Sequence, residues 1–365
     1  MMSNNGYSQY AAPTPITVYQ KLLLDEVIYS GWLAGDPNQE IGYIGKLREK
    51  IANFTGYRHV VLCSNGTTAL EAAVLATDAR GMLGNALSGN CAYVSGNTFV
   101  ATVLSVINHT DKRVAIAHTD DKTFNATKEE WVDIRVSYAG LPDTEKCIIL
   151  DSAHGLFANM SDVVQAKVVT ASFHAIKPLS CGEGGAILTN DSNIANFCLN
   201  WVSHGRYKSS VSKQIGTNAR MPNMMAALGY GSICTYQERM LNRQGLASLY
   251  RERLADCPVQ PQDDSPNHTY HLFPIACSTP SETENLRKYL QRKGIGVSDN
   301  YMPQEWHPSL LNSDLFYTDK IALDIHTWNK SNLQERLLCL PMHDSLTKDD
   351  VSFVSSCIRE YYKHK

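Results

Sequence analysis

The sequence predicts an α/β fold built around a mostly parallel sheet with helices on its faces. Five short runs rich in β-branched residues lie between residues 59 and 190, and each is bounded by turn residues. Helical patterns lie between several of these runs. This alternation of strand and helix is typical of α/β domains. Because ligands bind at the carboxyl ends of the strands in such sheets, the polar residues there are the candidate site residues.

The predicted elements follow one another in a regular order. The five strands are HVVLCS, RVAIAH, CIILDS, KVVTAS and GAILTN, at residues 59–64, 113–118, 147–152, 167–172 and 185–190. The segment TTALEAAVLA after the first strand places its apolar residues at helical spacing. Farther along the chain, three helical patterns are found at residues 243–257, 282–295 and 348–362. One strand-like run lies between the first two, at residues 269–277. We therefore expect residues 1–240 to form an N-terminal arm and a large domain, and residues 241–365 to form a small C-terminal α+β domain.

Composition restricts the class of protein. The 365 residues are 43% hydrophobic and 19% charged, which is ordinary for a soluble globular enzyme. The net charge of -3 gives no basic field for a nucleic acid. No apolar run approaches the roughly 20 residues that span a bilayer, and the first residues lack the pattern of a secretory signal. We expect no nucleic-acid partner, no membrane partner and a cytoplasmic location.

Cysteine and histidine give no sign of a metal site. The ten cysteines are scattered and never form C-x-x-C, so reduced thiols are expected. The twelve histidines form no H-E-x-x-H motif and have no cysteine partner at zinc spacing. Cys181 lies four residues after Lys177, but no base that would lower its pKa can be argued, so we interpret this thiol as structural.

Two predicted strands end in residues that could act chemically. After the first strand, Gly66 and Thr67 open a helix whose free N–H groups and dipole can hold an anion. An ordinary helix N-cap would explain the same residues. The third strand ends in Asp151, and His154 follows three residues later. An aspartate at that position is about equally often a helix cap.

A lysine completes the set. Ser172 ends the fourth strand and leads into a loop that carries Lys177 in front of Gly182, Gly184 and Gly185. A surface lysine would not need so tight a backbone. An anion site, a carboxylate and an amine thus meet at one edge of the sheet. Pyridoxal phosphate (PLP) needs all three, for its phosphate, for its protonated ring nitrogen and for the Schiff base that its aldehyde forms with lysine.

Five motifs in the same order resemble one family. They are SNGTTALEAAV, SGNTFVATVLSVI, DSAHGLFA, SFHAIKPLSCGEGGAILTN and GTNARMPNMMAALG. Together they resemble the DegT/DnrJ/EryC1/StrS aminotransferases, PLP enzymes of the aspartate-aminotransferase type I fold that aminate nucleotide-linked keto-sugars. The resemblance runs over nearly the whole chain, from SGWLAGDPNQEIGYIG to LPMHDSLTKDD. It implies a PLP-dependent transferase type I fold with a large cofactor domain and a small C-terminal domain.

The resemblance assigns a role to each candidate residue. Lys177 would form the Schiff base and act as the catalytic acid and base, Asp151 would pair with the ring nitrogen, and His154 would approach the 3-hydroxyl of the ring. Phe99 would stack on the face of the cofactor ring. The phosphate would be held by Gly66, Thr67 and Ser172. Asn218 would reach the phosphate from the neighbouring subunit, which makes the expected unit a homodimer with shared sites.

The substrate end of the site departs from the family pattern. The segment DNYMPQEWHP resembles a family stretch written His-Tyr-x-Pro-Leu-His, with Asn300 and Glu305 in place of the two histidines and Tyr301 kept. Tyr301, Glu305 and Arg220 are the expected substrate-binding residues, although Arg220 is also open to a structural role. The sugar is therefore less well defined than the cofactor.

The resemblance implies an aminotransferase that uses glutamate, with 2-oxoglutarate as its product, to aminate a nucleotide-linked keto-sugar. The expected sugar is a 4-keto-6-deoxyhexose. Three alternatives stay open at this point, namely a regulatory or binding protein without turnover, a PLP enzyme that acts on a cyclitol ketone, and a dehydratase. The presence of Lys177 argues against the sugar 3-dehydratases of the family, which carry a histidine at that position.

Overall fold

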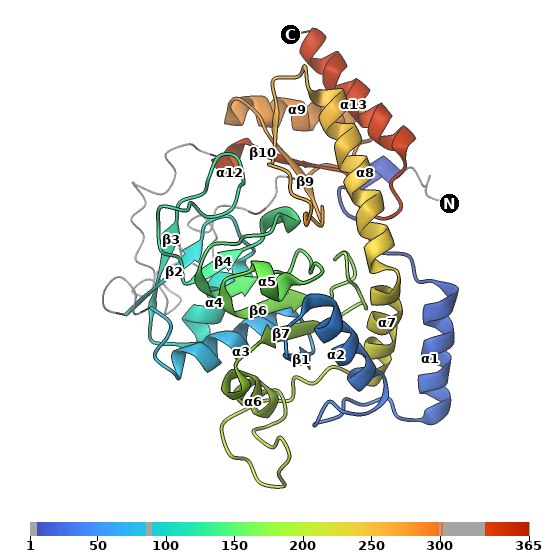
Figure 1. The fold of residues 1–365 in the computed structure, drawn as a ribbon. Helices are drawn as coiled ribbons and strands as arrows, with labels where there is room; N and C mark the ends of the chain where they lie inside the picture. Colours follow the sequence, from blue (N-terminus) through green and yellow to red (C-terminus); the bar gives the residue numbers. More distant parts are fainter. Residues whose placement is uncertain (1–5, 85–89, 299–300, 302–332, 365) are drawn as a thin grey trace.

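The computed structural model describes residues 6–84, 90–298, 301 and 333–364. Figure 1 shows a large sheet surrounded by helices, with the C-terminal strands and helices gathered beyond one end of it. In the described part of the chain, no helix is both long enough and apolar enough to cross a membrane.

The large sheet has seven strands in the order β1-β7-β6-β5-β4-β2-β3. Their bounds are β1 His59–Cys63, β2 Cys91–Ser95, β3 Arg113–Ala117, β4 Ile134–Val136, β5 Cys147–Asp151, β6 Ala166–Ser172 and β7 Gly185–Thr189. Strands β2 to β6 pair in parallel, and β7 runs antiparallel to both β6 and β1. The antiparallel pair arises because the segment between β6 and β7 contains no crossover helix. The predicted mostly parallel sheet is confirmed.

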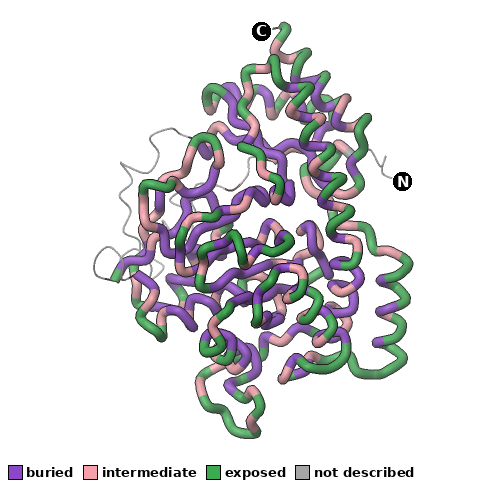
Figure 2. The backbone as a smooth tube through the Cα atoms, viewed as in Figure 1, coloured by how far each residue is buried: buried purple, intermediate pink, exposed green. Residues whose placement is uncertain are grey.

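Two helical layers cover the sheet. One face is covered by α3 (Gly66–Asp78), α4 (Val100–His109) and α6 (Ser192–Trp201). The other face is covered by α1 (Val18–Ser30), α2 (Gly42–Thr55) and α7 (Asn223–Cys234). A short helix, α5, spans Met160–Val163. Successive side chains of a strand point to opposite faces of the sheet, so each strand packs against both helical layers. Ile149 and Val168 pack into the α3 layer, whereas Leu150 and Val169 pack into the α2 layer. Figure 2 shows the strands buried between these helices.

The C-terminal part has its own small sheet and core. Strands β8 (Gln260–Pro261), β9 (Phe273–Ala276) and β10 (Leu337–Leu340) form an antiparallel sheet, and α8 (Tyr236–Leu254), α9 (Pro280–Arg292), α12 (Leu333–Arg336) and α13 (Lys348–Lys363) accompany it. These elements bury an apolar cluster of their own. The boundary expected after residue 240 falls inside α8, and the division into two domains stays a prediction.

A buried ionic network ties the C-terminal part to the loop that carries the lysine. Asp344 accepts hydrogen bonds from Arg243 at 2.7 Å, and from Arg239 and Thr14 at 2.8 Å each. Burial opposes the charge of Asp344, but the two guanidinium groups outweigh it and hold the pKa of the carboxyl below its usual value. Arg239 also donates to the carbonyl of Pro178 at 2.5 Å. The hydrogen bond from Arg239 therefore holds the backbone at Pro178, just after Lys177.

Candidate active site

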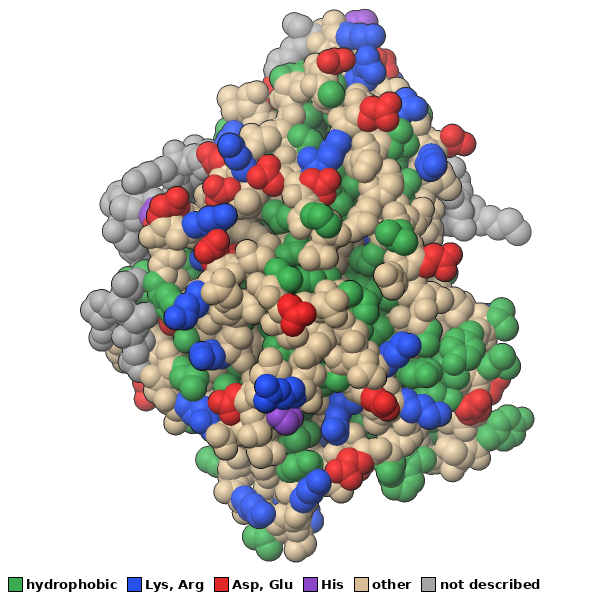
Figure 3. Space-filling model, in the orientation of Figure 1, with side chains coloured by type: hydrophobic (Ala, Val, Ile, Leu, Met, Phe, Trp, Pro, Cys, Tyr) green, Lys and Arg blue, Asp and Glu red, His purple; other side chains and the backbone are tan. Residues whose placement is uncertain are grey.

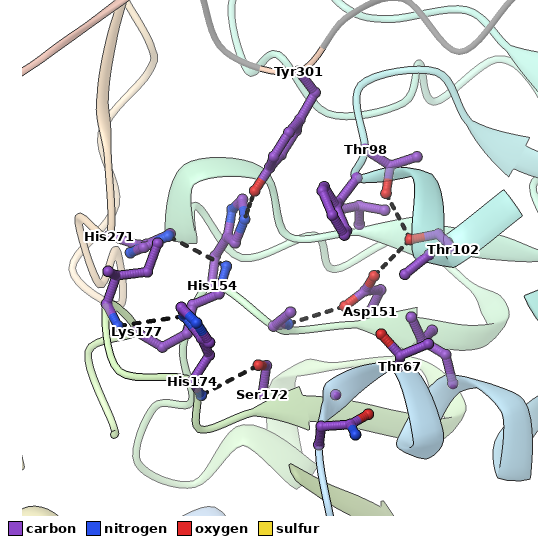
Figure 4. A pocket seen from close by; sticks show the side chains of 18 of the residues that line it. Thr67, Thr98, Thr102, Asp151, His154, Ser172, His174, Lys177, His271 and Tyr301 are labelled. Atoms are coloured by element: carbon purple, nitrogen blue, oxygen red, sulfur yellow. Dashed lines mark hydrogen bonds between the residues drawn. The ribbon is translucent and has the colours of Figure 1, made fainter. Parts of the chain in front are cut away.

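A pocket of about 800 Å³ opens at the carboxyl ends of the parallel strands. Figure 4 shows side chains from the large sheet, from the loop after β6 and from the C-terminal part pointing into it. The structure brings most of the predicted site residues together here: Gly66, Thr67, Phe99, Asp151, His154, Ser172, Lys177 and Tyr301. Their roles stay predictions, and their geometry shows what they can do.

The first turn of α3 forms one wall. Asn65 is the N-cap, and its side chain accepts a hydrogen bond from the N–H of Thr68 at 2.8 Å. The earliest N–H groups of a helix have no partner within it, so they are left for a ligand. A side chain at Gly66 would lie 2.6 Å from the Cβ of Ser172, so only glycine lets this helix start approach the end of β6. The helix end, Thr67 and Ser172 together suit a phosphate.

Asp151 ends β5 and is buried beneath the pocket floor. Its Oδ2 accepts a hydrogen bond from Thr102 at 2.8 Å, and Thr98 lies 2.7 Å from the hydroxyl of Thr102. Its Oδ1 accepts from the N–H of Ala153 at 3.0 Å. Burial raises the pKa of Asp151, and these hydrogen bonds with the nearby charge of Lys177 oppose the rise. A cationic ring nitrogen in the pocket would pair with this carboxylate.

Lys177 extends from the loop after β6 and is half-buried. Its Nζ lies 3.3 Å from Nε2 of His271. Burial lowers the pKa of the amine from 10.5 to about 8, although the charge of Asp151 opposes the change. At pH 7 about one amine in ten is then neutral, against roughly one in 3,000 for an ordinary lysine. The site thus keeps a nucleophilic amine at neutral pH.

His154 has a defined protonation state. Its Nδ1 accepts a hydrogen bond from the N–H of Ala139 at 2.8 Å, and its Nε2 lies 2.7 Å from the hydroxyl of Tyr301. Burial and the charge of Lys177 hold its pKa well below the usual value, so the ring is neutral. A neutral ring that accepts at Nδ1 carries its proton on Nε2. His154 therefore donates to the hydroxyl of Tyr301, and Figure 4 shows the two side chains directed at one another.

The remaining predicted residues lie in different surroundings. Phe99 is 55% exposed in the pocket wall, with its ring 5.6 Å from that of Tyr301, so it offers an aromatic face and is no core residue. Asn218 is exposed and Arg220 half-buried, and neither lines the pocket of its own chain. Glu305 lies outside the described residues.

Sequence reasoning missed three polar residues of the site. Thr98 and Thr102 support Asp151, but along the chain they resemble an ordinary helix start. His271 belongs to none of the five motifs and lies far along the chain from the strand ends that mark the site. In the described part of the chain, no group of three or more His, Cys, Asp or Glu residues is arranged to hold a metal ion.

Comparison with known proteins decides the family. The model of the DegT/DnrJ/EryC1/StrS aminotransferase family matches residues 19–133 and 142–359, which is most of the chain. The chain belongs to this family. The expected resemblance is confirmed, and so is the class of enzyme, because members of the family are PLP-dependent aminotransferases.

Individual members of the DegT/DnrJ/EryC1/StrS family are similar over almost their full length. GDP-perosamine synthase of Escherichia coli O157:H7 is 26% identical and aligns over 96% of this chain and 97% of its own. Among solved structures, PseC of Helicobacter pylori, an aminotransferase of pseudoaminic acid biosynthesis, has a TM-score of 0.80 at 21% identity, covering 98% and 99% of the two chains. The sugar aminotransferase Spr1654 of Streptococcus pneumoniae in its PLP form has a TM-score of 0.78 at 18% identity, covering 97% and 98%. These likenesses confirm the predicted type I fold.

Proposed function

We propose that this family member is a PLP-dependent aminotransferase that moves an amino group from glutamate to a nucleotide-linked keto-sugar, with a 4-keto-6-deoxyhexose as the sugar. The observation that carries the proposal is the meeting of a lysine of lowered pKa, a buried carboxylate and a helix N-terminus in one pocket. Lowered lysine pKa values of this kind are typical of amines that act as nucleophiles or bases.

The residues present fit PLP. Gly66 leaves room that a side chain would fill, so the N–H groups of α3, Thr67 and Ser172 would hold the phosphate. Asp151 would hold the ring nitrogen and Phe99 would cover a ring face. When bound, the cofactor supplies an aldehyde for the amine and an electron sink for the substrate carbon.

Lys177 is the residue that would move protons. Its Nζ gives up a proton easily because burial lowers its pKa to about 8, so near neutral pH it can both accept and return a proton. The hydrogen bonds from Thr102 and Ala153 favour the charged form of Asp151, which is the form that would pair with a cationic nitrogen. His154 stays neutral and orients Tyr301 at the pocket wall.

The pocket can accept more than a cofactor. Its volume of about 800 Å³ is at the upper end of the range for small-molecule sites, which leaves space for a hexose beside PLP. Tyr301 lines the pocket with its hydroxyl beside His154 and offers that hydroxyl to the sugar. The names of the relatives, among them GDP-perosamine synthase, agree with a nucleotide sugar as acceptor. Arg206, Lys208, Lys213 and Arg220 would supply cations for its diphosphate. They lie outside the pocket of their own chain, and Lys208 pairs with Glu40 at 2.9 Å.

We infer that the active unit is a homodimer. Asn218 lies outside the pocket of its own chain, as expected of a residue that serves the neighbouring subunit. An exposed apolar surface on α1 gives such a subunit something to bind. It consists of Val18, Tyr19, Leu22, Ile28 and Tyr29, and Figure 3 shows hydrophobic side chains gathered on that side of the molecule.

The test is to incubate the enzyme, PLP and glutamate with 3-keto and 4-keto nucleotide sugars and to look for the amino sugar by mass. Borohydride should in parallel fix the cofactor to the peptide that contains Lys177. A label on another lysine would refute the site. Turnover of a free cyclitol ketone alone would replace the nucleotide sugar as the proposed substrate. A sugar that loses water without gaining nitrogen would indicate a dehydratase. A bound cofactor without any turnover would favour a regulatory protein.

A further inference from the structure

His271 lies next to the amine of Lys177 and has no part in the function proposed so far. It comes just before β9, in the C-terminal part of the chain, and only 2% of it is exposed. Its Nε2 is 3.3 Å from Nζ of Lys177. Its Nδ1 is buried and has no hydrogen-bond partner among the described residues. A buried ring with one nitrogen unsatisfied and the other directed at a reactive amine calls for an explanation.

The surrounding backbone holds the ring of His271 in place. Thr269 donates to the carbonyl of His154 at 2.8 Å, and its own N–H donates to the carbonyl of Gly140 at 3.0 Å. On the other side, Arg243 donates to the carbonyl of Tyr270 at 3.0 Å. The ring itself packs against that of His154, with 4.6 Å between their centroids. His271 is thus a fixed point from which Nζ of Lys177 can be oriented.

The ring is also uncharged. Burial lowers the pKa of His271 well below its usual value, and the neighbouring cation of Lys177, the ring of His154 and the more distant Arg243 and His174 act in the same direction. A neutral imidazole can accept a hydrogen bond at Nε2 while its proton is on Nδ1. A carboxylate in the same place would stabilise the ammonium form and raise the pKa of Lys177. Histidine therefore provides an acceptor without the charge that would make the amine inactive.

We propose that His271 is a positioning residue: it accepts a hydrogen bond from Nζ of Lys177 and directs the amine into the pocket, and as a neutral acceptor it stabilises the charged form of the amine less than a carboxylate would. The proposal rests on the proposed function in one respect, because it gives a purpose to the orientation of Lys177. Its geometry and its first test do not depend on the cofactor. The titratable groups around Nζ are His271, Asp151 and His154: burial holds the pKa of both histidines well below its usual value, and burial raises the pKa of Asp151.

The decisive measurement is the reactivity of Lys177 in the cofactor-free protein. Acetylation by acetic anhydride is followed by peptide mass against pH, and its midpoint reports the pKa of the amine. We expect the midpoint near 8 in the wild type, little change in His271→Gln, and a rise of about one unit or more in His271→Glu. No rise in His271→Glu would overturn the proposal.

Turnover gives the second readout. With PLP restored, His271→Leu should lower kcat at least about tenfold with little change in KM, and His271→Gln should regain much of it through its carbonyl oxygen. His268 provides the matched control, because it is buried in the same segment but contacts Gln262 and Tyr270 and not Lys177. His268→Glu should leave the acetylation midpoint unchanged. Full activity in a folded His271→Leu protein would refute the positioning role, whereas borohydride labelling away from Lys177 would refute the proposed function instead.

Discussion

Lys177 should destabilise the cofactor-free protein, and replacing it should make the fold more stable. The pKa of its amine falls from 10.5 to about 8 on folding, so the folded state binds fewer protons than the unfolded state between these two values. By linkage, the wild type gains stability as pH rises through this window and carries the full penalty below it. A difference of about 2.5 in pKa corresponds to about 3 kcal/mol at pH 7. Because Lys177 is half-buried and water screens part of the effect, about 3 kcal/mol is an upper bound.

The assay compares urea unfolding of cofactor-free wild type and Lys177→Met, a change that keeps the length of the side chain and removes its charge. The variant should be more stable at pH 7 by up to about 3 kcal/mol, and the gain should fall to about 1 kcal/mol at pH 9.5. Lys50→Met on the exposed face of α2 is the control and should change little. A variant no more stable than wild type at pH 7, or a gain independent of pH, would refute the reasoning.

Three other predictions follow from the described contacts. Mixed dimers of the inactive Lys177→Ala and Asn218→Ala variants should recover some activity, because one site of each mixed dimer keeps both residues; no recovery would argue against a shared site. Cys181→Ser should keep most of the turnover, since burial raises the pKa of this thiol and leaves it protonated, and a loss of several orders of magnitude in kcat would show a catalytic thiol. Asp344→Asn should cost about 3 kcal/mol in urea unfolding at pH 7, because two guanidinium groups lose their counter-charge. The pKa of Asp344 is lowered on folding, so this difference should shrink as pH falls below about 4, and a constant difference would contradict the assignment.

The sequence predicted those parts of the fold that depend on local pattern. The five predicted strands match β1, β3, β5, β6 and β7, because each is a short apolar run with β-branched residues between turn residues. The three residues of β4 are too short for such a signal, and β2 was also missed. The position of β7 between β1 and β6 depends on distant pairing that no local pattern contains.

The same limit applies to the pocket. Gly66, Asp151, Ser172 and Lys177 could be found because each follows a strand, and strand ends meet at one edge of a parallel sheet. His271 comes from the other side of the pocket, on a segment whose approach is set by packing of the C-terminal part against the loop around His154. Periodicity along the chain does not report that contact.

The strand order has a consequence for how the protein folds. Cys63 of β1 pairs with Gly185 of β7, which is far away along the chain. The start of α3 therefore contacts Ser172 only after these two distant segments have paired. Long-range pairings of this kind form slowly, since the entropy of closing a long loop is lost before any contact is gained. During refolding, helical circular dichroism should therefore return before the pocket exists, and partly folded chains should have no affinity for a phosphate-bearing ligand. Capture of such a ligand would then report completed assembly of the sheet, and excess ligand would draw late intermediates toward the native state by mass action.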